Sequence, residues 1–111
     1  MKPTIIYSDF EKLDLRVGMI IEANVPEWSE KLLEFKVDFG EEIGMKTIFS
    51  GVKAWYQPED FLGKKFIFVV NLAERKMGPS VSQGMMLMAD QEDKPVPVPT
   101  PNDLQPGCPM A

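Results

Sequence analysis

LEFKVDF, at residues 33–39, is the stretch that decides the fold class of this chain. An apolar residue at every second position alternates there with Glu34, Lys36 and Asp38. This period of two puts one face of a β-strand against a core and the other in water, which is typical of antiparallel sheets. Gly40 follows directly and ends the run. The stretch therefore predicts a half-buried antiparallel strand.

The segments on both sides have the composition of further short strands. RVGMIIEAN and KFIFVVN are rich in β-branched and aromatic residues, while MKTIFS and MMLMA are short runs next to glycine. Gly18, inside the first of these runs, predicts a bulge or a tight bend. The expected strands are residues 16–24, 33–39, 45–50, 65–71 and 85–89.

Two short helical segments are expected outside the strands. Ser8 and Glu11 have the spacing of a capping box, which predicts a helix over about residues 9–14. A helical turn is predicted near residues 58–62, between the third and fourth strands, because a proline suits its first position and Gly63 suits its end. Both segments are too short to build a helical domain.

These elements predict an all-β fold, a five-stranded Greek-key barrel of the oligonucleotide/oligosaccharide-binding (OB) type. A five-stranded sandwich is the main alternative on pattern alone. The length of 111 residues fits one domain, with the barrel at about 15–90 and an extended tail at about 94–111. Six of the ten prolines lie between residues 95 and 109, so the tail is expected either as a loose end or as an arm along the barrel or a partner subunit.

Composition excludes several classes of function. The chain has no histidine, which removes the commonest general base and the commonest zinc ligand. Its paired carboxylates, Glu41-Glu42 and Glu59-Asp60, are adjacent in surface turns and point apart. We therefore expect no catalytic residues, no metal and no cofactor. One cysteine, and no apolar run long enough for a membrane span, predict a cytoplasmic protein without a membrane partner.

Charge is unevenly distributed along the chain. The net charge is -5, yet residues 45–77 carry +3 and the remainder carries -8. The basic window ends in NLAERKMGPSVSQGM, at residues 71–85, which lies between two apolar runs and is itself polar and rich in hydroxyl groups. A segregated basic surface of this kind allows an acidic protein to bind nucleic acid. The plain alternative is a chance fluctuation of charge.

Several stretches together resemble one family. DFEKLDLRVGMI at 9–20, SEKLLEFKVDFGEE at 29–42, FSGVKAWYQPEDFLGKKFIFVVNL at 49–72 and ERKMGPSVSQGMMLMA at 74–89 are similar, in order and spacing, to the tRNA-binding OB-fold domain. That family includes the C-terminal domain of bacterial methionyl-tRNA synthetases and free-standing dimeric tRNA-binding proteins. The resemblance covers about residues 8–90. A sister branch, the secretion-linked OB-fold chaperones, is resembled by DFGEEIGMK at 38–46.

The resemblance implies a non-catalytic, structure-specific tRNA-binding protein that contacts phosphates and overall shape through its strand-end loops. It also implies an aminoacyl-tRNA synthetase as a partner in trans, and no aminoacylation activity, since no catalytic domain precedes the barrel. The alternatives are a small export-related chaperone that binds unfolded peptide and a protein assembly module. The expected RNA-binding residues are Lys31, Ser50, Lys53, Asn71, Arg75, Lys76, Ser82, Gln83 and Met85.

A homodimer is expected as well, because the free-standing relatives are dimeric. The apolar residues near both ends of the chain lie outside the barrel strands and would be poorly covered in a monomer. The expected interface residues are Ile5, Ile6, Phe10, Leu13, Val96 and Val98.

Overall fold

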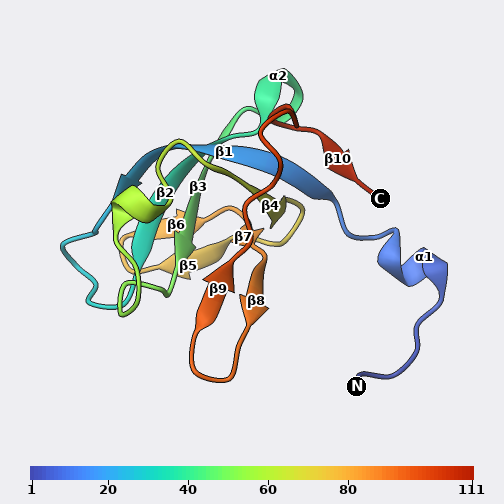
Figure 1. The fold of residues 1–111 in the computed structure, drawn as a ribbon, viewed down its shortest axis with the longest axis horizontal. Helices are drawn as coiled ribbons and strands as arrows, with labels where there is room; N and C mark the ends of the chain where they lie inside the picture. Colours follow the sequence, from blue (N-terminus) through green and yellow to red (C-terminus); the bar gives the residue numbers. More distant parts are fainter.

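The computed structural model describes all 111 residues and has the expected five strands in one curled antiparallel sheet (Figure 1). These five strands follow the order β3-β2-β1-β4-β7, and a sixth short strand from the tail joins the sheet beside β1. β1 is long enough to serve both sides of the sheet, since Leu15–Met19 pair with β4 and Met19–Asn24 pair with β2. The strand bounds are β1 Leu15–Asn24, β2 Leu33–Asp38, β3 Met45–Ser50, β4 Lys65–Val69 and β7 Met85–Met86.

The sheet closes into a barrel where the segment before β7 meets β3. The backbone of Gln83 donates to the carbonyl of Thr47 at 2.8 Å, and the Gln83 side chain accepts from the Thr47 N–H at 2.9 Å. At this closure, the two hydrogen bonds between Gln83 and Thr47 take the place of a regular strand-to-strand ladder. The nearly closed barrel confirms the OB-type fold and rules out the sandwich.

The core consists of the inward residues of the period-two strand and a plug at one end of the barrel. Phe35 and Val37 are completely buried, as the alternation predicts. The 3-10 turn η1 (Pro58–Asp60) delivers Phe61 into the core, where its ring lies 4.8 Å from that of Phe35. The predicted helical turn between the third and fourth strands is therefore confirmed.

The role of Gly18 differs from the prediction. The register shift in β1 lies between Ile20 and Glu22, so the predicted bulge is not at Gly18. A Cβ atom at Gly18 would lie 2.5 Å from a methyl carbon of Val37 and 2.6 Å from the ring of Phe39. Glycine is needed here because the strand packs tightly against core side chains.

The N-terminal helix exists but is shifted and capped differently. α1 spans Tyr7–Phe10, and its N-cap is Ile6, without a side-chain hydrogen bond. The capping box predicted for Ser8 and Glu11 is wrong, because Ser8 already lies inside the helix. Residues 1–9 are all exposed, and Figure 1 shows this arm standing away from the barrel.

The polar segment after β4 is a hairpin, and the expected fifth strand is divided. β5 pairs with β6 across a tight turn, while β7 ends before Leu87 and a separate strand β8 pairs with the tail strand β9. A short helix, α2, occupies the β2–β3 connection, where no helix was expected. The bounds are β5 Arg75–Met77, β6 Ser80–Ser82, β8 Met88–Asp90, β9 Pro95–Pro97 and α2 Gly40–Ile43.

The proline-rich tail folds back on its own barrel. β9 pairs with β8, and the last strand, β10 (Pro109–Met110), pairs with the start of β1. The N–H of Val17 donates to the carbonyl of Cys108 at 2.9 Å, and the ammonium group of Lys65 donates to two tail carbonyls. The tail is an arm on the barrel, one of the two expected arrangements.

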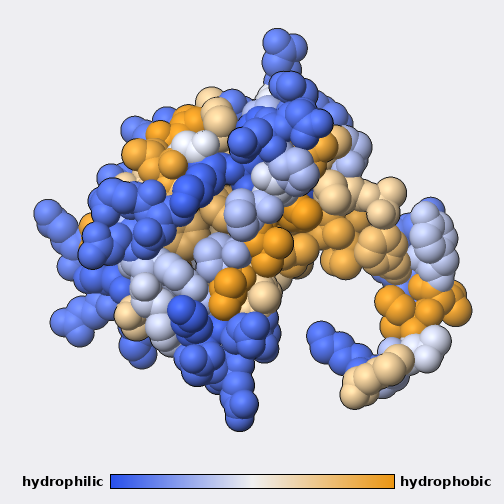
Figure 2. Space-filling view, viewed as in Figure 1, coloured by the Kyte–Doolittle hydropathy of each residue, from blue (hydrophilic) through white to orange (hydrophobic).

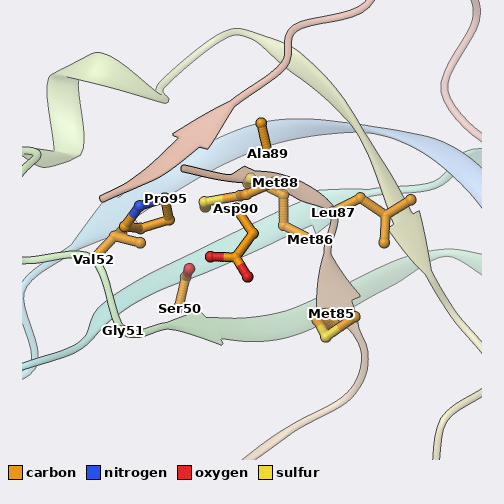
Figure 3. A pocket seen from close by; sticks show the side chains of 10 residues that line it. All are labelled: Ser50, Gly51, Val52, Met85, Met86, Leu87, Met88, Ala89, Asp90 and Pro95. Atoms are coloured by element: carbon orange, nitrogen blue, oxygen red, sulfur yellow. The ribbon is translucent and has the colours of Figure 1, made fainter. Parts of the chain in front are cut away.

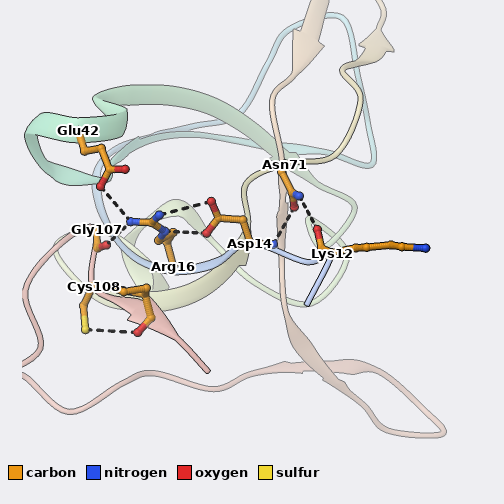
Figure 4. A network of polar contacts seen from close by, with 8 residues as sticks. Lys12, Asp14, Arg16, Glu42, Asn71, Gly107 and Cys108 are labelled. Atoms are coloured by element: carbon orange, nitrogen blue, oxygen red, sulfur yellow. Dashed lines mark hydrogen bonds and ion pairs between the residues drawn. The ribbon is translucent and has the colours of Figure 1, made fainter. Parts of the chain in front are cut away.

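A charged network fastens the end of this tail (Figure 4). The guanidinium of Arg16 bonds the carboxylate of Asp14 at 2.6 Å, reaches Glu42 of α2 at 3.3 Å and donates to the carbonyl of Gly107 at 3.1 Å. The hydrogen bond that Arg16 donates to Asp14 is the main reason that the pKa of Arg16 is raised above its ordinary value. No helix of the chain has the length and apolar character needed to span a membrane.

Candidate nucleic-acid interface

The β5–β6 hairpin is held against the β1–β2 loop by one tryptophan. The turn residue Gly78 has φ +54°, and a Cβ atom there would lie 2.5 Å from the indole of Trp28. The same indole packs at 5.5 Å from the ring of Phe49 on β3. Since glycine alone permits both this backbone conformation and this contact, the two loops form one continuous surface.

Arg75 and Lys76, adjacent in sequence, lie on opposite faces of the hairpin. Arg75 pairs with Ser82 and lines a narrow crevice together with Met77 and Met85. Lys76 pairs with Val81 on the other face. Alternation along a strand causes this separation, so the two cations reach different parts of a ligand.

Two lysines of neighbouring loops add charge to this surface. The N–H of Lys53, which follows β3, donates to the carbonyl of Lys31, in the β1–β2 loop, at 3.2 Å. Neither these lysines nor the hairpin cations take part in an ion pair. The four charges are therefore available to an anionic ligand, although Glu74 directly precedes Arg75 in the sequence.

Three of the expected RNA-binding side chains are engaged within the fold. Asn71 accepts from the N–H of Asp14 at 2.8 Å and donates to the carbonyl of Lys12 at 2.7 Å, which ties the N-terminal arm to the end of β4 (Figure 4). Ser82 is 3% exposed, and its hydroxyl accepts from the backbone of β3. Gln83 closes the barrel and also donates to Glu74 at 3.3 Å. These groups hold the loops in position, and little of their hydrogen-bonding capacity remains for a ligand.

Ser50 and Met85 lie beside a hollow that the sequence did not indicate (Figure 3). Met85 is 47% exposed and lines both this hollow and the crevice of Arg75. The other walls come from Met88 and Asp90 of β8 and from Pro95 of β9. No local pattern could reveal this set, because the hollow depends on the break between β7 and β8 and on the return of the tail.

The residues expected at a dimer interface fall into two groups. Val96 is half-buried in β9, where it pairs with Ala89 of β8, so its segment is partly covered by the chain itself. Ile5 and Ile6 are 61% and 69% exposed, and Figure 2 shows apolar atoms on an arm separated from the barrel by open space. Of the remaining residues, Phe10 is half-buried, and Leu13 and Val98 are exposed.

Comparison with known proteins agrees with this geometry. Residues 15–109 match a family model described as "Putative tRNA binding domain". Over 91 residues, or 81% of its length, the chain is 53% identical to a methionine–tRNA ligase of Chromobacterium violaceum, of which it spans only 13%. The likeness thus concerns one region of a much longer enzyme.

Solved structures resemble the whole chain. A MetRS-related protein from Pyrococcus horikoshii superimposes with a TM-score of 0.92 at 35% identity, covering 99% of this chain and 100% of that protein. The CsaA chaperone protein from Picrophilus torridus has a TM-score of 0.87 at 31% identity, covering 97% and 100%. Both branches anticipated from the sequence are represented among these structures.

Proposed function

We propose that this chain, which belongs to the family of tRNA-binding domains, binds folded tRNA without catalysing a reaction on it. The observation that carries the proposal is the joined surface of the β1–β2 loop, the end of β3 and the β5–β6 hairpin. Arg75, Lys76, Lys31 and Lys53 lie on it without ion-pair partners. Loops at this end of an OB barrel are where such folds bind oligonucleotides.

Contact with tRNA is made mainly through phosphates and shape. The amides of Asn71 and Gln83 and the hydroxyl of Ser82 are occupied within the fold, which leaves few groups to read base edges. Arg75 can hold one phosphate through two parallel hydrogen bonds, and each lysine supplies a point charge. The outer corner of folded tRNA presents such a phosphate surface, so recognition depends on folded structure more than on the anticodon.

The setting of this activity is part of the proposal. We propose that the 111 residues act as one domain in the cytoplasm, that the protein is a homodimer, and that it assists a synthetase in trans. The apolar arm supports the dimer, because Ile5, Ile6 and Leu13 find no cover on their own barrel. The similarity to a methionine–tRNA ligase supports a synthetase as the partner.

Gel-shift titration tests the function directly. Folded tRNA, the same tRNA unfolded, and an unstructured peptide are compared at two salt concentrations. Folded tRNA should bind more tightly than unfolded tRNA, and its affinity should fall steeply as salt rises, because phosphate contacts release counterions. Equal binding of the two RNA forms, or binding of peptide alone, would end the proposal.

A chaperone that binds unfolded peptide is the second candidate. Its support is the likeness to CsaA together with the hollow lined by Met85 and Met88, since flexible thioethers adapt to varied apolar side chains. The unpaired cations of the hairpin favour the tRNA proposal, because an apolar peptide offers them no partner.

A further inference from the structure

The hollow beside β8 has the size of a small-molecule site. Its volume is about 370 Å³, inside the range of roughly 300–1,000 Å³ that is usual for such sites. It lies between the end of β3 and the β8–β9 hairpin, and Met85 separates it from the crevice of Arg75 (Figure 3). A group bound in the hollow would therefore be the neighbour of a group held by Arg75.

The walls of the hollow suit a flat ring. Met86 and Met88 supply thioethers, and Val52 and Pro95 supply rigid apolar surface. Leu87 points away from the hollow in Figure 3. Thioethers and a proline ring make favourable contacts with aromatic rings, so Met88 and Pro95 can contact a base, while the buried side chains of Met86 and Val52 form the floor of the hollow.

One side of the hollow is polar. Asp90 lies directly opposite Pro95 in the β8–β9 pair, and its carboxylate points toward the hydroxyl of Ser50 (Figure 3). No ion pair neutralises Asp90, and the Ser50 hydroxyl has no partner among the side-chain hydrogen bonds of the chain. The hollow thus offers the two acceptor oxygens of one carboxylate, that of Asp90, beside one hydroxyl group that can donate.

We propose that this hollow takes an unpaired guanine of the bound RNA. The Watson–Crick edge of guanine carries two adjacent donors, N1–H and the N2 amine, next to the O6 acceptor. Asp90 can accept both donors, and Ser50 can donate to O6, so the two edges are complementary. The inference rests on the proposed function and adds one base-reading position to a surface that otherwise contacts phosphates.

The other bases fit this edge poorly. Adenine and cytosine each present one amine beside a ring nitrogen that accepts, which would face a carboxylate oxygen. Uracil presents a single N–H between two carbonyl acceptors. A carboxylate in the hollow also disfavours a phosphate there, which leaves the phosphate to Arg75 across Met85. Charge complementarity therefore places the base in the hollow and the phosphate backbone at the crevice of Arg75.

Nuclear magnetic resonance of the 111-residue chain with ¹³C-labelled methionine methyls tests the inference. Guanosine, inosine, adenosine, cytidine and uridine monophosphates are titrated separately. The methyls of Met86 and Met88 should shift with guanosine monophosphate, while Met45, at the far end of β3, serves as the internal control. Inosine lacks the N2 amine and so loses one of the two bonds; it and adenosine should bind at least about fivefold more weakly.

Two matched variants separate base reading from general charge. Asp90→Asn and Asp93→Asn remove the same charge from the same exposed hairpin. If only general charge mattered, each variant should bind all the nucleotides more tightly, and by the same factor for each nucleotide. The inference expects Asp90→Asn to reduce the preference for guanosine to less than about twofold, and Asp93→Asn to preserve it. Equal guanosine preference in both variants would overturn the inference, as would a set of nucleotides that the wild-type chain does not distinguish.

The outcomes separate this inference from the proposed function. If wild-type protein binds folded tRNA while no methyl of the hollow responds to tRNA or to guanosine, the base site is wrong and the function stands. If the guanosine preference is present but folded tRNA does not bind, the function is wrong and the base site stands. A methionine- or phenylalanine-containing peptide that shifts the same methyls more than guanosine monophosphate at equal concentration overturns the base site in favour of peptide binding.

Discussion

The hydroxyl of Ser82 accepts a hydrogen bond from the backbone N–H of Phe49 at 3.0 Å, across 33 residues of sequence. The same hydroxyl donates to the carbonyl of Gly84 at 3.1 Å. One side chain therefore completes the junction between β3 and the β5–β6 hairpin, where the barrel has no regular ladder. The hairpin that carries Arg75 is positioned by this bond.

Ser82→Ala should lower the free energy of unfolding by about 1–3 kcal/mol, because it leaves the buried N–H of Phe49 without a partner. Chemical denaturation measures the change. Ser80→Ala is the matched control: it alters the neighbouring hydroxyl of the same strand, which makes no side-chain hydrogen bond within the chain, and should change stability by less than about 0.5 kcal/mol. Equal effects of the two substitutions would show that the bond is unimportant.

Asn71→Ala should release the N-terminal arm while leaving the barrel folded. The substitution removes the bonds to the N–H of Asp14 and the carbonyl of Lys12. Hydrogen exchange of residues 11–14 should become faster, and the arm should be cut sooner by protease. Asn71→Asp keeps the acceptor and loses the donor, so its effect should be intermediate. Unchanged exchange at the Asp14 amide would contradict the anchoring role.

Arg75→Ala should weaken binding of folded tRNA by about 1–3 kcal/mol if its contact is bidentate. Lys76→Ala should weaken it less and reduce the salt slope by about one unit, because a lysine contributes one point contact. Since the two side chains lie on opposite faces of β5, their effects should be close to additive. The measurement is a salt-dependent titration of each single variant and of the double variant.

Lys64→Ala is the matched control for these variants. Lys64 is an exposed cation without an ion-pair partner, and it precedes β4 at the end of that strand remote from the hairpin. Its removal should change tRNA affinity little. A folded Arg75→Ala/Lys76→Ala double variant that binds tRNA as tightly as Lys64→Ala does would remove the site assignment.

Arg16→Ala should destabilise the chain by about 1–3 kcal/mol, since Arg16 joins β1 to the tail and makes a charged hydrogen bond with Asp14. Because the pKa of Arg16 is raised in the folded state, its stabilisation is fully present below the ordinary pKa of arginine and is lost only in stronger base. The loss on substitution should therefore be equal at pH 7 and pH 10. Lys36→Ala, which breaks an exposed pair with Glu22, should cost less than about 1 kcal/mol.

Deleting residues 1–6 should leave the stability of the barrel unchanged, because every one of these residues is exposed. If the arm joins two subunits, the wild-type mass in solution should be twice 12.6 kDa, and the deletion variant should have the mass of one shortened chain. Light scattering at several concentrations measures both forms. A wild-type mass of 12.6 kDa would exclude the dimer.

Deleting residues 106–111 is the informative contrast with the arm. It removes the backbone bonds of Gly107 and Cys108 to Val17 and the pairing of β10, so it should destabilise the barrel by roughly 1–3 kcal/mol. The tail thus cannot be tested as a dimer element by removal alone. Val98→Asp, at an exposed position of the tail, probes a contact between subunits without breaking these bonds.

The barrel could be predicted from local pattern because the spacing of apolar residues within a strand indicates which of its side chains are buried. The alternation at residues 33–39 reappears as a strand with Phe35 and Val37 fully buried, and the proline and glycine around residues 58–63 mark the turn that carries Phe61. The basic loop was also visible as composition. Such signals lie within a few residues of one another and need no knowledge of distant segments.

The roles of the polar side chains depend on contacts between distant segments. Asn71, Ser82 and Gln83 carry the groups suited to a ligand. The fold nevertheless brings backbone groups within hydrogen-bonding distance of all three side chains. These backbone groups belong to Lys12, Phe49 and Thr47, which lie 33 to 59 residues away along the chain. Likewise, Ser50 and Asp90 share a hollow only because the tail returns to pair with β8. Sequence alone determined that these residues are polar and lie near turns or glycines. The tertiary structure decided which of them are already bonded and which remain free, because a hydrogen bond depends on distance in space and not on separation along the chain.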